Sequence, residues 1–246
     1  MAGGLSSIFV LSFLSLLPWL FYCNCCCTNT SIHGHEIKGM FVFGSSLLDN
    51  GNNNFLQDSQ ARADYSPYGI DFPLVGPTGR FTNGKNIIDL LCYKLMLPFI
   101  PTFSDPLTRG RKIIHGVDFA SGGSGILDST GSIAGKVISL NEQIRNFEEV
   151  TLPDLEAQLG CKSAESLAHY LFVVGTGGND YSFNYFLNPS NLSLEAFTTN
   201  LTASLSQKIK RVIGDEQKFD CNLTIEPLIF AEIHTYTCIN YSLLAS

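Results

Sequence analysis

The sequence predicts an α/β fold, a three-layer α/β/α sandwich built around a parallel sheet. Three short apolar runs, at Lys38–Phe43, Val117–Ala120 and Tyr170–Gly175, have the composition of buried strands. Amphipathic helices are expected between and after them, and this alternation is typical of a sheet with helices on both faces. With 246 residues, of which 45% are apolar and 15% charged, the chain can form one α/β domain with a substantial core.

The first expected strand, Lys38–Phe43, ends at Gly44 and runs into a polar turn rich in Ser, Asp and Asn. A hydroxyl at this end of a strand lies where open α/β sheets usually bind their ligands, so Ser46 is a candidate functional residue. A strand followed by an ordinary Ser- and Asn-rich loop has the same composition. Composition alone does not separate these two interpretations.

The next elements are a long loop and three helices. Asp64–Gly79 is rich in Pro and Gly and is either a loop that shapes a substrate site or a plain surface loop. Apolar residues at helical spacing predict a helix over Asn86–Leu97, which Pro98 ends. The same periodicity predicts helices over Ser139–Val150 and Ser193–Gly214.

The second and third expected strands also run into glycine-rich polar turns. Gly116–Ile126 reads GVDFASGGSGI, and backbone amides in such a turn can point at an anion. A flexible corner without a ligand has the same composition. Tyr170–Gly175 leads directly into Thr176-Gly-Gly-Asn-Asp, a sequence that is common in loops. A parallel sheet would bring all three turns to one edge.

Met1–Cys27 is expected to be a secretory signal peptide. Ile8–Tyr22 is almost entirely apolar, and no charged side chain precedes His33. A membrane anchor is the alternative, but the run is short for a span, so we expect no stable membrane insertion and a secreted, extracellular protein. The remainder, residues 28–246, is expected to be the folded domain.

Net charge, cysteine spacing and sequons limit the classes of partner, cofactor and modification that we expect. The net charge is −7 with no basic patch, which excludes a typical nucleic-acid partner. No CxxC spacing or His/Cys cluster follows the leader, so neither a metal site nor a cofactor is expected. Four cysteines remain whose pairing the sequence leaves open, namely Cys92, Cys161, Cys221 and Cys238. Five sequons make glycosylation candidates of Asn29, Asn191, Asn200, Asn222 and Asn240.

The stretch FVFGSSLLDNGNNN at residues 41–54 resembles the first block of the plant GDSL esterase/lipases of the SGNH hydrolase superfamily, usually FVFGDSLVDNGNNN. The resemblance implies a flavodoxin-like SGNH fold with Ser46 as the nucleophile. Ser45 stands where the family carries Asp, which is a departure beside the nucleophile.

Two further blocks extend the resemblance. GVDFASGGSG is similar to the family's second block, GxNxASxxxG, and implies that the Gly123 amide is an oxyanion donor. Asp118 replaces the usual Asn of that block. Gly-Gly-Asn-Asp at residues 177–180 is similar to the third block, GxND, and implies that Asn179 is the other oxyanion donor.

The resemblance covers about residues 38–214 and then stops. The family continues to a DxxH block that carries the catalytic Asp and His, whereas the tail at residues 215–246 has His234 with Ala231 three residues before it. We therefore expect a partial hydrolase domain, truncated before DxxH and C-terminally incomplete. We also expect the divergent tail to lack the final strand and helix that would cover the sheet edge. His33, His35, His115 and His169 are interpreted as ordinary residues rather than as the base.

The resemblance implies a secreted GDSL-type serine esterase or lipase that hydrolyses small-molecule or polymer-linked carboxylic esters through Ser46, without a cofactor. The alternative is a non-catalytic, truncated family member, either a binding or interaction protein or an unproductive isoform, because no Asp–His pair is identified.

Overall fold

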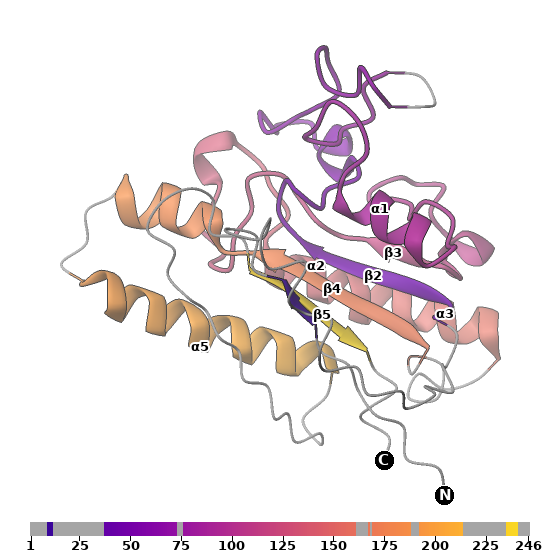
Figure 1. The fold of residues 1–246 in the computed structure, drawn as a ribbon. Helices are drawn as coiled ribbons and strands as arrows, with labels where there is room; N and C mark the ends of the chain where they lie inside the picture. The colour runs from indigo at the N-terminus through magenta and orange to yellow at the C-terminus, as the bar shows by residue number, and fades with distance from the viewer. Residues whose placement is uncertain are drawn as a thin grey trace, which may run out of the picture.

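The computed structural model describes residues 9–11, 37–72, 76–160, 167, 169–187, 192–213 and 235–240, with the backbone alone for residues 9–11 and 235–240. These residues form one five-stranded sheet with helices on both of its faces (Figure 1), which confirms the predicted α/β fold. The strands are β1 Phe9–Leu11, β2 Gly39–Gly44, β3 Gly116–Asp118, β4 Tyr170–Thr176 and β5 Thr235–Asn240. The α-helices are α1 Ile87–Lys94, α2 Leu140–Asn146, α3 Leu152–Leu159 and α5 Leu194–Ile213.

The strand order is β1-β5-β4-β2-β3, and β2 is parallel to both β3 and β4. In the register, Val42 pairs with Asp118 of β3, and Gly44 pairs with Gly175 of β4. The carboxyl ends of β2, β3 and β4 therefore meet at one edge of the sheet. This is the edge where open α/β sheets usually bind ligands.

The expectation of an uncovered sheet edge was wrong. β5 pairs antiparallel along β4 from Leu171↔Asn240 to Thr176↔Thr235, and β1 pairs antiparallel with β5. The sequence of β5, TYTCIN, is rich in β-branched and aromatic residues, which favour a strand. The resemblance to the family gives no signal for this strand, because the segment lies beyond the last matching block, and its pairing with β4 is a contact between distant parts of the chain.

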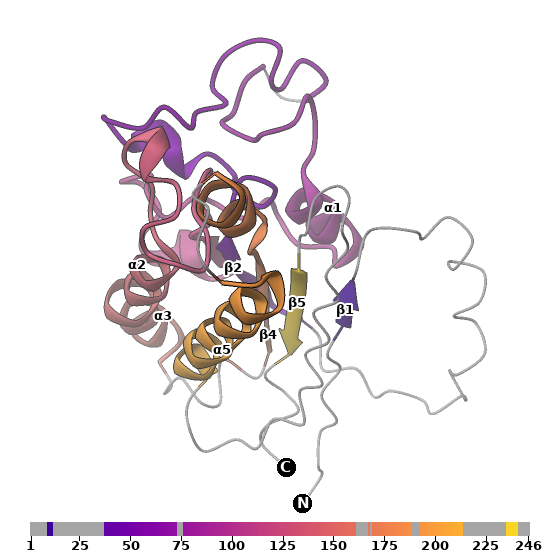
Figure 2. The ribbon, with the colours of Figure 1, turned by 90° about the vertical axis from the view of Figure 1, so that its left-hand side faces the viewer.

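Helices cover the two faces of the sheet unequally. Figure 2 shows α2, α3 and α5 together on one face and α1 on the other. Strand alternation sends Phe41 and Phe43 of β2 towards the first group, where they pack with Phe147 and Phe172 in one buried cluster. Met40 and Val42 point the other way, into a second cluster with Ile88 of α1 and Cys92. The two clusters form the core on either side of β2.

The helices begin and end for local reasons. Asn86 caps α1 by accepting a hydrogen bond from the Asp89 amide, and the Asp89 side chain accepts from the Asn86 amide in return. Ser139 accepts a hydrogen bond from the Glu142 amide at the start of α2. The helix expected over Ser139–Val150 is longer than predicted, because a π-helical turn over Phe147–Thr151 connects α2 directly to α3. Single-turn 3-10 helices lie at Asn52–Phe55, Gly110–Ile113 and Ser132–Ala134, and a second π-helix lies at Asp180–Phe186.

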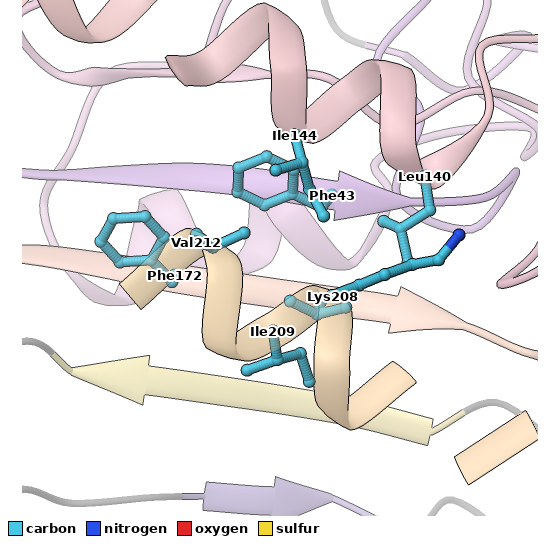
Figure 3. A pocket seen from close by; sticks show the side chains of 8 residues that line it. Phe43, Leu140, Ile144, Phe172, Lys208, Ile209 and Val212 are labelled. Atoms are coloured by element: carbon cyan, nitrogen blue, oxygen red, sulfur yellow. The ribbon is translucent and has the colours of Figure 1, made fainter. Parts of the chain in front are cut away.

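A pocket lies between α5, α2 and the sheet (Figure 3). Its lining is apolar except for Lys208, and it contains none of the three candidate site residues. We interpret it as a packing gap under α5. The lining residues are Phe43, Leu140, Ile144, Phe172, Val174, Lys208, Ile209 and Val212.

Candidate active site

Ser46 lies in the turn that directly follows β2, and its side chain is partly exposed. The turn begins where the Ser45 amide donates to Gly175 O of β4 at 3.0 Å, and it closes where the Leu48 amide donates to Ser45 O at 3.0 Å. Gly44 has φ of +146°, and a Cβ there would lie 2.0 Å from Gly175 O, so only glycine allows the two strands to approach this closely. The Ser46 hydroxyl is therefore presented at the carboxyl edge of the sheet.

Gly123 lies in the turn that follows β3, next to the Ser46 turn. Its φ of +86° is one that side chains rarely adopt. The turn is held against β2 because the Ser121 amide donates to Gly44 O at 2.9 Å. Among the residues that the structure describes, the Gly123 amide donates to no backbone carbonyl. An N–H group without a protein partner at this edge has the chemistry of an oxyanion donor.

Asn179 lies three residues after the end of β4 and connects the third turn to the second. Its Nδ2 donates to Ser124 O at 2.8 Å, which uses one of the two amide hydrogens and leaves the other for a ligand. The neighbouring Asp180 is buried and accepts hydrogen bonds from the amides of Ile126 and Leu127, at 2.8 and 2.9 Å, and from Thr130 Oγ1. Burial raises the pKa of Asp180. These bonds hold the Gly123 and Asn179 turns together.

Two buried carboxylates, Asp49 and Asp118, connect the Ser46 turn to the segment that carries Gly123. Asp49 Oδ2 accepts from the Gly122 amide at 2.8 Å, and Asp118 Oδ2 accepts from the Asn50 amide at 2.6 Å. Each carboxylate thus belongs to one segment and binds a backbone amide of the other. Sequence reasoning recorded Asp118 only as a departure from a family block and missed Asp49. The available signal was an acidic residue, Asp118, inside an expected buried strand, and a second one, Asp49, in the polar turn after another expected strand.

Burial dominates the electrostatics of this pair. Desolvation raises the pKa of Asp49 to about 6 against the opposing effect of its amide donors and of Arg80. Burial and the neighbouring Asp49 charge together raise the pKa of Asp118 well above its ordinary value. The nearby Arg80 guanidinium donates two hydrogen bonds to the Asp89 carboxylate, at 2.7 and 2.8 Å. Its positive charge therefore only partly offsets the rise in the pKa of Asp49 and Asp118.

The asparagines of the DNGNNN stretch fasten the Ser46 turn to the segment that follows β3. Asn52 Nδ2 donates to the carbonyls of Asp118 and Ala120, both at 2.9 Å. Asn53 Nδ2 donates to Gly122 O at 2.8 Å. Both side chains are buried. The sequence predicted a turn for this stretch. In the structure, the side-chain amides of the stretch also connect two segments that are distant in the chain.

The comparisons with known proteins agree with this architecture. A sequence model described as "GDSL-like Lipase/Acylhydrolase" matches residues 40–239, which is most of the chain. This chain belongs to that GDSL family. Among the similar proteins of Arabidopsis thaliana, GDSL esterase/lipase At5g08460 is 47% identical over 66% of this chain and 45% of the relative. GDSL esterase/lipase At1g71250 is 47% identical over 62% of this chain and 40% of the relative. The chain thus spans less than half the length of these relatives. No solved structure matches it.

The family's usual Asp before the nucleophile is Ser45 in this GDSL chain. The Ser45 side chain is 1% exposed, and its hydroxyl has no hydrogen-bond partner among the described residues. Thr176, which follows the register partner of Gly44 on β4, is equally buried and also without a partner there. Two buried hydroxyl groups next to the candidate site, those of Ser45 and Thr176, are thus unsatisfied among the described residues.

No described histidine of this GDSL chain reaches the carboxyl edge. His115 directly precedes β3 and its Nδ1 lies 2.9 Å from Lys38 O, while His169 directly precedes β4, so both lie at the amino ends of strands. His33, His35 and His234 lie outside the described residues. Within the described ranges no group of three or more His, Cys, Asp or Glu side chains could hold a metal ion.

The other candidate residues are spread over the fold. Asn200 is exposed on α5 and Asn240 ends β5, whereas Asn29, Asn191 and Asn222 lie outside the described residues.

Cys92 is a buried free thiol, and burial raises the pKa of this thiol to about 11. Cys238 lies in β5, and Cys161 and Cys221 are outside the described part. None of the described helices is long and apolar enough to cross a membrane.

Proposed function

We propose that this chain is the nucleophile- and oxyanion-bearing part of a serine esterase or lipase that hydrolyses carboxylic esters. The observation that carries the proposal is the meeting of three turns, those of Ser46, Gly123 and Asn179, at the carboxyl edge of three adjacent parallel strands. Family membership supports the reaction class, since the similar proteins are named GDSL esterase/lipases.

In the proposed reaction, the Ser46 hydroxyl gives its proton to a base and its Oγ attacks the acyl carbon of the ester. The negative charge that develops on the carbonyl oxygen is stabilised by the Gly123 amide and by the free hydrogen of Asn179 Nδ2. The alcohol then leaves with a proton, and water hydrolyses the acyl-enzyme to release the acid. The chain's own residues thereby supply nucleophile and oxyanion hole, and no cofactor enters the scheme.

The proposed base is the His of a DxxH block in full-length family members, oriented by the Asp of that block as in other serine hydrolases. In this chain the residues after 214 contain His234 but no Asp three residues before it. We therefore propose that residues 1–246 alone turn over esters weakly, because general base assistance is worth roughly 10²–10⁴-fold. The second candidate function, a non-catalytic family member, is favoured by the same observation.

Turnover of p-nitrophenyl butyrate tests the proposal. The measurement compares residues 1–246 with Ser46→Ala, and a GDSL relative that has DxxH serves as the positive control. Slow turnover that Ser46→Ala abolishes supports the esterase. Turnover unchanged in Ser46→Ala rejects Ser46 as the nucleophile, and no turnover at all beside an active relative favours the non-catalytic alternative.

We further propose that residues 1–27 are a signal peptide, that residues 28–246 form the exported domain, and that this domain is secreted and glycosylated. The apolar leader and the five sequons support this. Protein made in a plant secretory system is expected to begin near Thr28 and to lose mass on deglycosylation. Intact Met1 on unmodified protein would contradict the proposal.

A further inference from the structure

Gln143 of α2 is a fully buried polar side chain that binds both backbone groups of one residue, Gly44. The Gly44 amide donates to Gln143 Oε1 at 2.8 Å, and Gln143 Nε2 donates to Gly44 O at 2.9 Å. Nε2 also donates to Ile138 O at 2.9 Å, which orients the amide group. A buried primary amide with both ends satisfied has one orientation, so Gln143 is a rigid contact.

Gly44 is the last residue of β2 and lies two residues before Ser46. The register between β2 and β3 ends at Val42↔Asp118, so Gly44 extends past the last strand pair on that side. On this side the Gly44 amide donates to Gln143 Oε1, while the Gly44 carbonyl accepts from both Gln143 Nε2 and the Ser121 amide. On the opposite side Gly44 is pressed against Gly175 of β4. The start of the Ser46 turn is thus held from both sides.

The same amide also reaches the oxyanion turn. Gln143 Nε2 lies 3.3 Å from Ser124 Oγ, and Ser124 Oγ lies 2.9 Å from Gly44 O. Ser124 directly follows Gly123, and its carbonyl accepts the hydrogen bond from Asn179 Nδ2. A single side chain therefore contacts the beginning of the nucleophile turn and the residue that joins the two oxyanion donors.

We propose that Gln143 is a positioning residue that sets the placement of Ser46 relative to Gly123 and Asn179. It acts through Gly44 and Ser124 and does not touch the substrate. Its effect on turnover rests on the esterase function proposed above, whereas its effect on the geometry of the edge does not. Loss of the amide is expected to displace the nucleophile from the oxyanion donors while substrate binding remains.

The test uses the full chain with Gln143→Met, which keeps the length of the side chain but removes its hydrogen bonds. The matched control is Ile144→Ala, at the next position of α2, where a buried apolar side chain lines the gap with Phe43 (Figure 3). Gln143→Glu is the conservative variant in its protonated form, because the carboxyl group then accepts from the Gly44 amide and can donate to a carbonyl, whereas the ionised form would face the carbonyl oxygens of Gly44 and Ile138. Amide hydrogen exchange is measured by NMR at Gly44 and, as an internal reference, at Val173 of β4.

Gln143→Met is expected to speed exchange at Gly44 by about tenfold or more relative to Val173, since the opening is local. Ile144→Ala is expected to leave that ratio unchanged, and Gln143→Glu to bring the ratio back towards that of the unmodified chain at acid pH, where the buried carboxyl group holds its proton. On p-nitrophenyl butyrate, kcat is expected to fall roughly 10- to 100-fold in Gln143→Met with KM unchanged, the size of effect that a misplacement of about 1 Å produces.

An unchanged Gly44-to-Val173 ratio in Gln143→Met overturns the proposal, and so does a fall in kcat no larger than that in Ile144→Ala. If the unmodified chain shows no turnover, the proposed esterase function fails for these residues. The exchange ratio then decides by itself whether Gln143 positions the turn, so the two failures are distinguishable.

Discussion

At the scale of single residues, the two proposed oxyanion donors are already oriented in the fold. Asn179 Nδ2 donates one of its two hydrogens to Ser124 O, and this bond fixes the direction of the other hydrogen. Gly123 presents a backbone amide from a turn that its positive φ permits. A donor fixed in advance needs no reorganisation when charge develops, which is why such groups contribute strongly to the rate.

Asn179→Ala is expected to reduce kcat for p-nitrophenyl butyrate by about 10²–10³-fold, the usual cost of removing one oxyanion donor. The control is Asn141→Ala, whose amide binds the Asp128 carboxylate on the surface of the molecule. Steady-state kinetics of both variants give the comparison. Equal activities would show that Asn179 is a structural tie between turns and not an oxyanion donor.

At the scale of elements, α5 covers the sheet through an apolar stripe. Leu201 and Leu205 are buried in the larger core cluster, with Phe197, Ile209 and Val212 packed beside them. Lys208 crosses from this helix to donate to Ile126 O at 2.7 Å, which connects α5 to the segment after the oxyanion turn. The helix therefore supports the sheet by hydrophobic burial, and Lys208, Thr198 and Phe197 contact the segments beside the candidate site.

Leu205→Ala is expected to lower the free energy of unfolding by about 2–5 kcal/mol, because it removes a fully buried side chain and leaves a cavity. Gln207→Ala, on the exposed face of the same helix, is expected to change it little. Urea denaturation followed by circular dichroism measures both. Comparable losses in the two variants would mean that α5 does not pack on the sheet as described.

At the scale of the whole molecule, the carboxyl edge concentrates buried acidic groups. Desolvation raises the pKa of Asp49, Asp118 and Asp180 above the ordinary aspartate value. A carboxyl group with a higher pKa in the folded protein holds its proton more tightly when folded. Its contribution to stability is therefore full at low pH and is lost as the pH rises through the folded value.

Stability is accordingly expected to fall as the pH rises from about 4 to above 6, the range between the ordinary aspartate pKa and that of Asp49. The loss should be on the order of 1–3 kcal/mol, given 1.36 kcal/mol per pKa unit. Asp118→Asn should flatten this slope by removing one of the two coupled charges. Asp64→Asn, in an exposed pair with Arg62, should leave it unchanged.

Urea unfolding between pH 4.5 and 7.5 measures the slope in all three proteins. Stability that rises over this range in the unmodified chain would contradict the prediction, since it would mean that the amide donors outweigh burial at these carboxylates.

The sequence alone determined the local elements. β2, α1 and α5 were predicted within a few residues because hydrophobic periodicity and stop signals such as Pro98 act over short stretches. It also placed Ser46, Gly123 and Asn179 in polar turns after three strands, and the family resemblance assigned them roles that stay predictions. The α/β fold and family membership are confirmed.

Only the tertiary structure decided how these turns are joined. The bond between the Gly44 amide and Gln143 spans 99 positions, and that between the Asn50 amide and Asp118 spans 68. The pairs between β5 and β4 span 59 to 69 positions, from Thr176↔Thr235 to Leu171↔Asn240. Such contacts leave no periodic signal, because a buried amide or carboxylate is stabilised by whichever backbone group the fold brings to it. The chain's local patterns specify the turns, and their geometry follows from packing between distant segments.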